Sequence, residues 1–258
     1  PFQTRFSVEA VRPITRNAFF RNVAISPDGA RLIYAGVAAG TRQQLFVRRL
    51  DQLDTQEMRG IPDGNSPFFS PDGQSVGFFV ASSSELKKAP IDGGAIISLS
   101  KYSGTPRGAT WGANDTIVFA TNDLATGLFS VPAGGGDPQI LTRPDTEKGE
   151  QDHLFPSMLP GDRALLFTIA RAGGGVDNSQ VAALDLESGR TTTLVRGGSH
   201  AIYVDSGHLV YAAAGGLRAV RFDPFLDLFQ LTAAYVRAAI GLMQLLREAL
   251  DRADRSRA

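Results

Sequence analysis

The sequence predicts an all-β protein, a β-propeller with five recognisable four-stranded blades followed by a C-terminal amphipathic α-helix. Three observations lead to this prediction. The tetrapeptide Ser-Pro-Asp-Gly occupies residues 26–29 and again 70–73, each time between two apolar, strand-like runs. Degenerate copies of this turn recur along the chain at a nearly constant spacing. Two further strand-like runs follow each copy, and four strands per repeat of this length are typical of a propeller blade.

The repeated turn is explained by its residue types. Proline presets φ for a type I turn, aspartate accepts local backbone hydrogen bonds, and glycine adopts the left-handed conformation that follows. The predicted structural turn residues are Pro27, Asp28, Gly29, Pro71, Asp72 and Gly73. We therefore interpret the two aspartates as turn formers and not as catalytic carboxylates.

The repeats can be aligned on their turns. The first turn residues are Ser26, Ser70, Gly112, Leu159 and Val204, which are spaced by 44, 42, 47 and 45 residues. An aromatic residue follows in the second strand of every repeat: Tyr34, Phe78, Phe119, Phe167 and Tyr211. Third strands are expected at 44–50, 85–91, 127–133, 180–186 and 216–222, and fourth strands at 95–100, 138–143 and 191–196. We expect the single tryptophan, Trp111, to pack between two blades.

Composition and motifs argue against several functions. The 26 basic residues balance 26 acidic ones and no basic block stands out, so nucleic acid is not an expected partner. The absence of cysteine excludes a disulfide scaffold, a thiolate metal site and a cysteine nucleophile. His153, His200 and His208 lack a metal-ligand spacing, and neither a nucleophile elbow nor a kinase motif occurs. We expect no catalytic, metal-binding or cofactor-binding residues, and no enzymatic activity.

The turns and the order of strands resemble the TolB-type propeller family, the PD40 class of WD40-like repeats. Within it, "RFSVE", "PFFSPDGQSVGFF" and "LKKAPIDGGA" are similar to propeller domains of bacterial receptor-like serine/threonine kinases. The resemblance covers roughly residues 3–223 and implies six blades and an extracytoplasmic, periplasmic location. Because only five repeats can be counted, we expect an incomplete or irregular ring, with residues 4–10 as its closing strand.

We divide the chain into an N-terminal segment (1–21), propeller repeats (22–223) and a helical tail (224–258). The tail is rich in good helix formers from about residue 232 to 252, with apolar residues at helical spacing. Its predicted interaction residues are Leu231, Tyr235, Ile240, Leu242, Met243, Leu246 and Leu250. Two interpretations stay open: the helix packs on its own propeller, or it docks into a partner or a membrane interface. Arg237 and two glutamines argue against a bilayer span.

The function expected from these features is that of a non-enzymatic scaffold. We expect a protein-interaction subunit of a larger assembly at a membrane, whose partners are other protein subunits. Two alternatives stay open: a ligand-sensing domain of a receptor-like kinase, and a hydrolase-type propeller with carboxylates and histidines on its axis. The polar segments 37–44 and 142–155 are further candidates for recognition, because loops on a rigid scaffold commonly carry binding.

Overall fold

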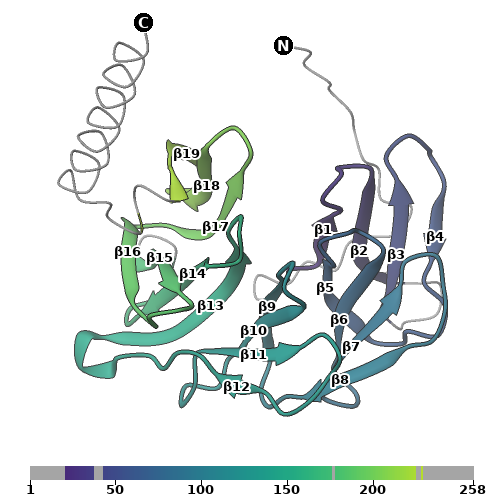
Figure 1. Ribbon diagram of the computed structural model, residues 1–258, viewed down its shortest axis with the longest axis horizontal. Helices are drawn as coiled ribbons and strands as arrows, with labels where there is room; N and C mark the ends of the chain where they lie inside the picture. The colour runs from purple at the N-terminus through teal and green to yellow at the C-terminus, as the bar shows by residue number, and fades with distance from the viewer. Residues whose placement is uncertain (1–20, 38–42, 176–177, 225–227, 229–258) are drawn as a thin grey trace, which may run out of the picture.

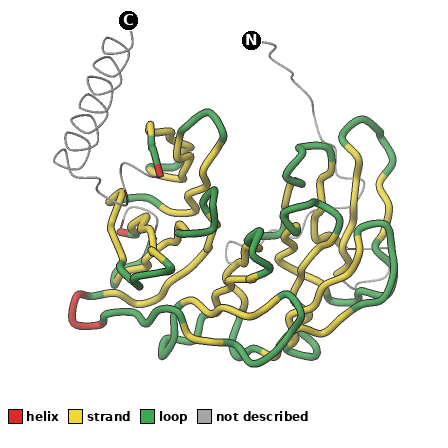
Figure 2. Tube along the Cα trace, in the orientation of Figure 1, coloured by secondary structure: helices red, strands yellow, loops and turns green. Residues whose placement is uncertain are grey.

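The computed structural model describes residues 21–37, 43–175, 178–224 and 228 (Figure 1). They form five antiparallel sheets that lie one after another along an arc, with the first and the fifth sheet at its two ends. Figure 2 shows that strands and loops make up almost all of this part of the chain. It also contains a short 3-10 helix, η1 (Thr146–Lys148). The predicted all-β propeller with an irregular ring is confirmed.

Each sheet is a meander in which the strand order follows the chain. The first blade comprises β1 (Val23–Ile25), β2 (Arg31–Val37), β3 (Gln43–Arg49) and β4 (Thr55–Glu57). The second comprises β5 (Gly64–Phe69), β6 (Ser75–Val80), β7 (Glu85–Pro90) and β8 (Ile97–Lys101). The third comprises β9 (Pro106–Trp111), β10 (Thr116–Thr121), β11 (Leu128–Pro132) and β12 (Gln139–Ile140). The fourth comprises β13 (Glu150–Met158), β14 (Ala164–Arg171), β15 (Gln180–Asp185) and β16 (Thr191–Arg196).

The fifth blade has three strands among the described residues: β17 (Ser199–Val204), β18 (His208–Ala213) and β19 (Gly216–Arg221). Residues 1–20 and 229–258 lie outside the described part of the chain. They contain the predicted closing strand and all seven predicted interaction residues of the tail. No helix among the described residues is long and apolar enough to cross a membrane.

The predicted turns are confirmed in all five repeats. In each, the N–H of the fourth turn residue donates to the C=O of the first, with N···O distances of 2.8–3.2 Å. The fourth residues all have left-handed φ values of 54–78°: Gly29, Gly73, Asp115, Asp162 and Gly207. In the second copy, Ser70 Oγ donates to Asp72 Oδ1 at 2.5 Å, and that oxygen also accepts the N–H of Gln74 at 3.0 Å. The side chains therefore stabilise the turn as the sequence predicts.

The blades pack face to face through apolar side chains. Tyr34, Phe78, Phe119 and Phe167 are at most 1% exposed, whereas Tyr211 in the fifth blade is half-buried. Separate core clusters join the first to the second blade, the second to the third, the third to the fourth and the fourth to the fifth. Trp111 belongs to the cluster between the second and third blades, as predicted.

The predicted strand at 138–143 is too long, because only Gln139–Ile140 pairs as β12. The backbone N–H groups of Leu141 and Thr142 both donate to the carbonyl of Leu128, at 2.8 and 3.3 Å. The hydroxyl of Thr142 accepts the N–H of Leu128 at 2.9 Å, so a side chain replaces the next ladder contact. A side-chain contact of this kind competes with the strand ladder and ends the strand.

The innermost strands of four blades contain a β-bulge at the same position. Strand register shifts by one residue in β5, β9, β13 and β17, four residues before the first turn residue. The residues there have positive φ values of 47°, 93°, 55° and 55°: Ser66, Gly108, Phe155 and His200. A bulge changes the direction in which a strand presents its side chains. These four bulges therefore determine which side chains line the axis.

Candidate binding site on the propeller axis

A cavity of about 530 Å³ lies on the axis, bordered by the inner strands of the first, second, third and fifth blades. Most of its lining is apolar: Val23, Ala24, Ile25, Pro27, Pro67, Phe68, Phe69, Ala109, Trp111 and Ile202. Three polar side chains complete it: Arg21, Thr110 and His200. A concave apolar surface with a few polar groups is the usual form of a ligand site.

Arg21 brings a positive charge to this cavity. Its guanidinium carbon lies 5.7 Å from the centroid of the Phe155 ring, and Nη2 donates to the Phe155 carbonyl at 3.4 Å. Burial lowers the pKa of Arg21 to about 10, so the side chain stays charged at neutral pH. Within the described residues Arg21 forms no ion pair with a carboxylate. The charge is therefore available to an anionic ligand.

His200 stacks on the same aromatic ring. The His200 and Phe155 ring centroids are 3.6 Å apart, and the planes are inclined by 26°. Burial, and secondarily the charge of Arg21, lower the pKa of His200 to about 4. Its Nδ1 lies 2.9 Å from the hydroxyl of Ser199. At neutral pH His200 is therefore an uncharged imidazole, and Arg21 carries the positive charge of this stack.

The indole of Trp111 contributes a donor without an acceptor. Trp111 is 9% exposed, and its Nε1 is buried without a hydrogen-bond partner in the described part of the chain. The ammonium of Lys88 lies 5.6 Å from the ring centroid of Trp111. A buried donor without a partner is costly, and a ligand oxygen that reached it would remove that cost.

A second group of polar residues lies on the inner strands. Asn65 Oδ1 and Ser66 Oγ on β5 are buried and without partners among the described residues. On β13, burial raises the pKa of Asp152 to about 7, while Arg107 acts in the opposite direction. Perturbed carboxylates are common at functional sites. No hydrogen bond or ion pair between described residues joins Asp152 to His200.

The other histidines have local roles. His153 is 3% exposed; its Nδ1 lies 2.8 Å from Thr142 Oγ1 and its Nε2 lies 3.0 Å from Glu150 Oε2. His208 contacts the neighbouring Ser206. Among the described residues, no group of three or more His, Asp or Glu side chains could hold a metal ion.

The structure describes the two predicted recognition segments to different extents. Residues 150–155 of the segment 142–155 belong to strand β13, and the rest contains η1, whose N-cap Asp145 accepts the N–H of Lys148. Part of this segment is therefore strand and not loop, and its residue His153 belongs to the fourth blade. In the segment 37–44, residues 38–42 lie outside the described residues.

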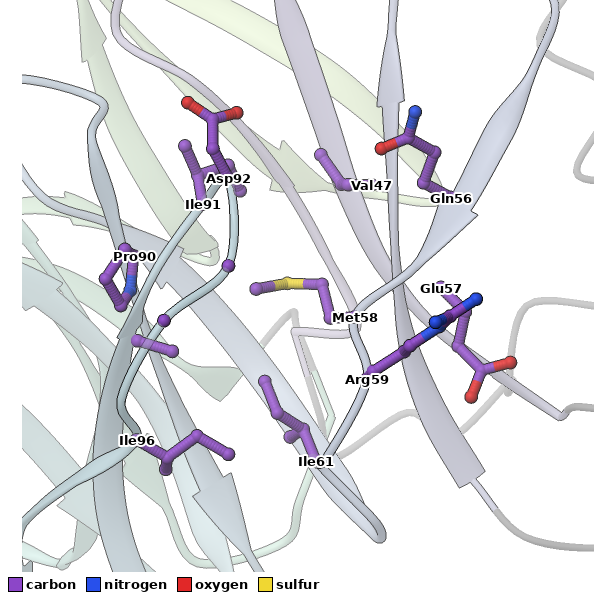
Figure 3. Close-up of a pocket in the computed structure, with 13 residues that line it drawn as sticks. Val47, Gln56, Glu57, Met58, Arg59, Ile61, Pro90, Ile91, Asp92 and Ile96 are labelled. Carbon is purple, nitrogen blue, oxygen red and sulfur yellow. The ribbon is translucent and has the colours of Figure 1, made fainter.

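A cavity of about 490 Å³ lies between the first and second blades, and Figure 3 shows the side chains around it. Met58 points into its middle, with Ile61, Ile96 and Pro90 around it. Asp92 stands at the rim, where it forms a 3.7 Å ion pair with Arg31. Polar side chains line this cavity as well, namely Gln56, Glu57, Arg59 and Asp92, and Asp92 already has a partner in Arg31.

No protein-family model matches the sequence, and no curated protein matches it. The structure of TolB from Acinetobacter baumannii is 17% identical, with a TM-score of 0.59, and the match covers 77% of this chain and 53% of that chain. A protein assigned as TolB in Agrobacterium tumefaciens is 19% identical, with a TM-score of 0.58, covering 67% of this chain and 64% of that one.

A puromycin-hydrolysing peptidase of Mycobacterium tuberculosis is also similar, at 17% identity and a TM-score of 0.54. The match covers 81% of this chain and 39% of the peptidase. The chain thus has the fold of TolB β-propellers, as the resemblance of its turns implies. It spans 53% and 64% of the two TolB structures, and identities this low concern the fold alone. The resemblance to kinase-linked propellers stays a prediction.

Proposed function

We propose that the protein is a non-enzymatic propeller that binds a segment of another protein on its axis, as a scaffold subunit of a larger assembly. The observation that carries this proposal is the axial cavity. It combines the charged Arg21 with an apolar wall that includes Trp111, whose buried N–H has no partner in the described chain. Function on a propeller depends on the site and not on the fold, so the argument rests on these groups.

The chemistry of the cavity favours an anionic, partly apolar ligand. A guanidinium can donate two parallel hydrogen bonds to one carboxylate. The indole N–H is a donor and cannot accept, so it too requires an oxygen from the ligand. The aromatic and aliphatic wall would bury apolar groups beside that carboxylate. A protein segment with an acidic residue between apolar ones has these features.

One observation favours binding over catalysis. No hydrogen bond in the described chain joins Asp152 to His200, the candidate acid and base of the axis. The hydroxyl that lies 2.9 Å from His200 Nδ1 belongs to the adjacent Ser199, which is only 4% exposed and is not part of the cavity lining. The puromycin-hydrolysing peptidase has the same fold but is matched over only 39% of its length. A propeller of this fold can therefore belong to an enzyme, and the absence of activity here is our proposal.

The proposal also concerns the assembly and where it is located. We infer an extracytoplasmic, membrane-associated assembly from the resemblance to TolB-type propellers and from the amphipathic pattern of the tail. The tail lies outside the described residues, so its role as a dock stays a prediction. It is tested by native co-purification of the intact protein beside a variant that ends at Asp223.

The axial site is tested by photo-crosslinking in cells. A photoreactive residue at Ile25, on the lining of the cavity and 59% exposed, is compared with one at Leu124, which is 68% exposed and not part of that lining. We expect a defined protein to crosslink from position 25 and not from position 124, and the Arg21→Met or Trp111→Phe variant to lose the product. Arg49→Met serves as a surface control, because Arg49 pairs with the exposed Asp51.

Two results would contradict the proposal. One is the absence of a protein crosslink at position 25. The other is a crosslink that neither the Arg21 nor the Trp111 variant changes. Capture of a small molecule in place of a protein would favour the ligand-sensing alternative.

A further inference from the structure

A separate cavity of about 420 Å³ lies between the second and third blades. Ser84, Lys101 and Tyr102 of the second blade form one wall. Asp123, Thr126 and Phe129 of the third blade form the facing wall. None of these residues lines the axial cavity or the cavity of Figure 3. A ligand here would contact both blades.

The interior of this cavity is aromatic. Phe79 of the core makes edge contacts with Tyr102, at 5.3 Å between centroids and 82°, and with Phe119, at 6.1 Å and 65°. Phe129 stacks on Phe119 at 5.1 Å and 15°. Tyr102 and Phe129 are only partly buried, so both present ring surface to the cavity. Aromatic rings favour such stacked and edge-to-face neighbours, so the walls suit a further ring.

The hydroxyl of Tyr102 does not add a charge to this wall. It donates to the carbonyl of Val80 at 3.4 Å. Burial raises the pKa of Tyr102 to about 12, so the phenol stays neutral over the physiological range. The aromatic part of the cavity is therefore uncharged and fixed in place.

Each blade contributes one charge of opposite sign to this cavity. In the described part of the chain, neither Lys101 nor Asp123 forms an ion pair. Glu85, the cross-strand neighbour of Lys101, pairs with Lys87 at 2.8 Å. One oxygen of Asp123 accepts the N–H of Ala125 at 3.0 Å, which orients the carboxylate. The cavity thus offers one cation and one anion beside an aromatic surface.

We propose that this cavity binds a free amino acid with an aromatic side chain. The ring lies between Tyr102 and Phe129, the α-carboxylate pairs with Lys101, and the α-ammonium pairs with Asp123. Ligands with only one of the two charged groups would leave the other protein charge without a partner, so they bind less well. This site is independent of the axial one and of the function proposed for it.

The proposal is tested by isothermal titration calorimetry with L-phenylalanine as the probe. Three analogues each lack one feature: 3-phenylpropionate lacks the ammonium, phenethylamine lacks the carboxylate, and L-alanine lacks the ring. We expect L-phenylalanine to bind and each analogue to bind at least about tenfold more weakly. Two of the analogues lose one charged hydrogen bond, and L-alanine loses the burial of the ring. A dissociation constant for L-phenylalanine weaker than about 1 mM would overturn the proposal.

Charge variants test the assignment of the two ends. Lys101→Met should weaken L-phenylalanine and 3-phenylpropionate and leave phenethylamine unchanged, whereas Asp123→Asn should weaken L-phenylalanine and phenethylamine. Asp205→Asn, on an exposed turn of the fifth blade, is the matched control. Equal affinities in all three variants would overturn the proposal. Amide chemical-shift changes in the unmodified protein give a second readout: they should map to 101–103 and 123–129, and changes elsewhere would overturn it.

Discussion

The ring of Phe68 lies where a side chain at position 77 would begin. A Cβ added to Gly77 would be 2.1 Å from Cζ of Phe68, and the two residues face each other across β5 and β6. The same ring meets Trp111 at 6.4 Å and 62°. Because Phe68 and Trp111 both line the axial cavity, the missing side chain of Gly77 sets the position of its aromatic wall.

Gly77→Ala should therefore destabilise the protein strongly. We expect a loss of about 2–3 kcal/mol or more in the free energy of unfolding, because the new methyl group overlaps the Phe68 ring. Urea denaturation measures it, with Gly134→Ala as control, since a Cβ at Gly134 would meet nothing within 4 Å. In the double variant Gly77→Ala/Phe68→Ala the two losses should be less than additive; full additivity would contradict the contact.

The repeat and its turns could be predicted from sequence because their cause is local. A type I turn followed by a left-handed residue needs particular residues at fixed offsets, and the apolar runs around it alternate with period two. Even the degenerate turns kept this geometry, with Asp115 and Asp162 in the left-handed position that glycine holds elsewhere. The spacing therefore located turns that the residue types alone would not identify.

Substitution by glycine should affect the free energy of unfolding differently at these two aspartates. Asp115 has φ of 59° and Asp162 has φ of 54°, a conformation that glycine adopts at lower cost. Asp162 Oδ2 also accepts the N–H of Asn114 at 2.9 Å, whereas Asp115 has no such side-chain contact among the described residues. We expect Asp115→Gly to raise the free energy of unfolding by about 0.5 kcal/mol and Asp162→Gly to give no gain. Thermal and urea denaturation compare them, and equal gains would contradict this explanation.

The axial site could not be predicted in the same way. Its polar groups, Arg21, Trp111 and His200, come from three blades and share no motif. The bulge in four of the inner strands also shifts the alternation by one residue, so period two does not show which side chain faces the axis. The sequence identified Trp111 only as a packing residue and placed Arg21 only at the end of the N-terminal segment 1–21. The role of Asp152 depends on burial, which one sequence does not reveal.

His153 should make the protein sensitive to acid. Burial lowers its pKa below the ordinary value of 6.5, while the carboxylate of Glu150 acts against this shift. The unfolded chain therefore binds the proton more readily, and stability is lost as the pH falls below about 6.5. At pH 7.5, His153→Leu should lower the free energy of unfolding by about 1–3 kcal/mol, because the contacts to Thr142 and Glu150 are removed. On acidification the variant should lose less stability than the unmodified protein does, because it has no imidazole to protonate. Urea denaturation at several pH values tests this, with His208→Gln as control; an unchanged pH profile in His153→Leu would contradict it.

Asp152, the neighbour of His153, should have the opposite pH dependence. Burial raises its pKa from an ordinary 3.8 to about 7, so the folded protein holds this proton more tightly than the unfolded chain does. Stability contributed by the protonated form is present at low pH and is lost as the pH rises from about 4 through about 7.

Asp152→Asn keeps an oxygen for the backbone N–H of His153, which Asp152 Oδ1 accepts at 2.8 Å, and removes the ionisation. We expect the stability of the variant relative to the unmodified protein to increase by about 1–3 kcal/mol between pH 5 and pH 8. Because His153 and Asp152 act in opposite directions below about pH 6.5, their effects partly cancel in the unmodified protein, and only the single variants separate them. Urea denaturation across this range measures the difference, with Asp205→Asn as control, and a difference that stays constant from pH 5 to pH 8 would show that Asp152 is not desolvated in the folded protein.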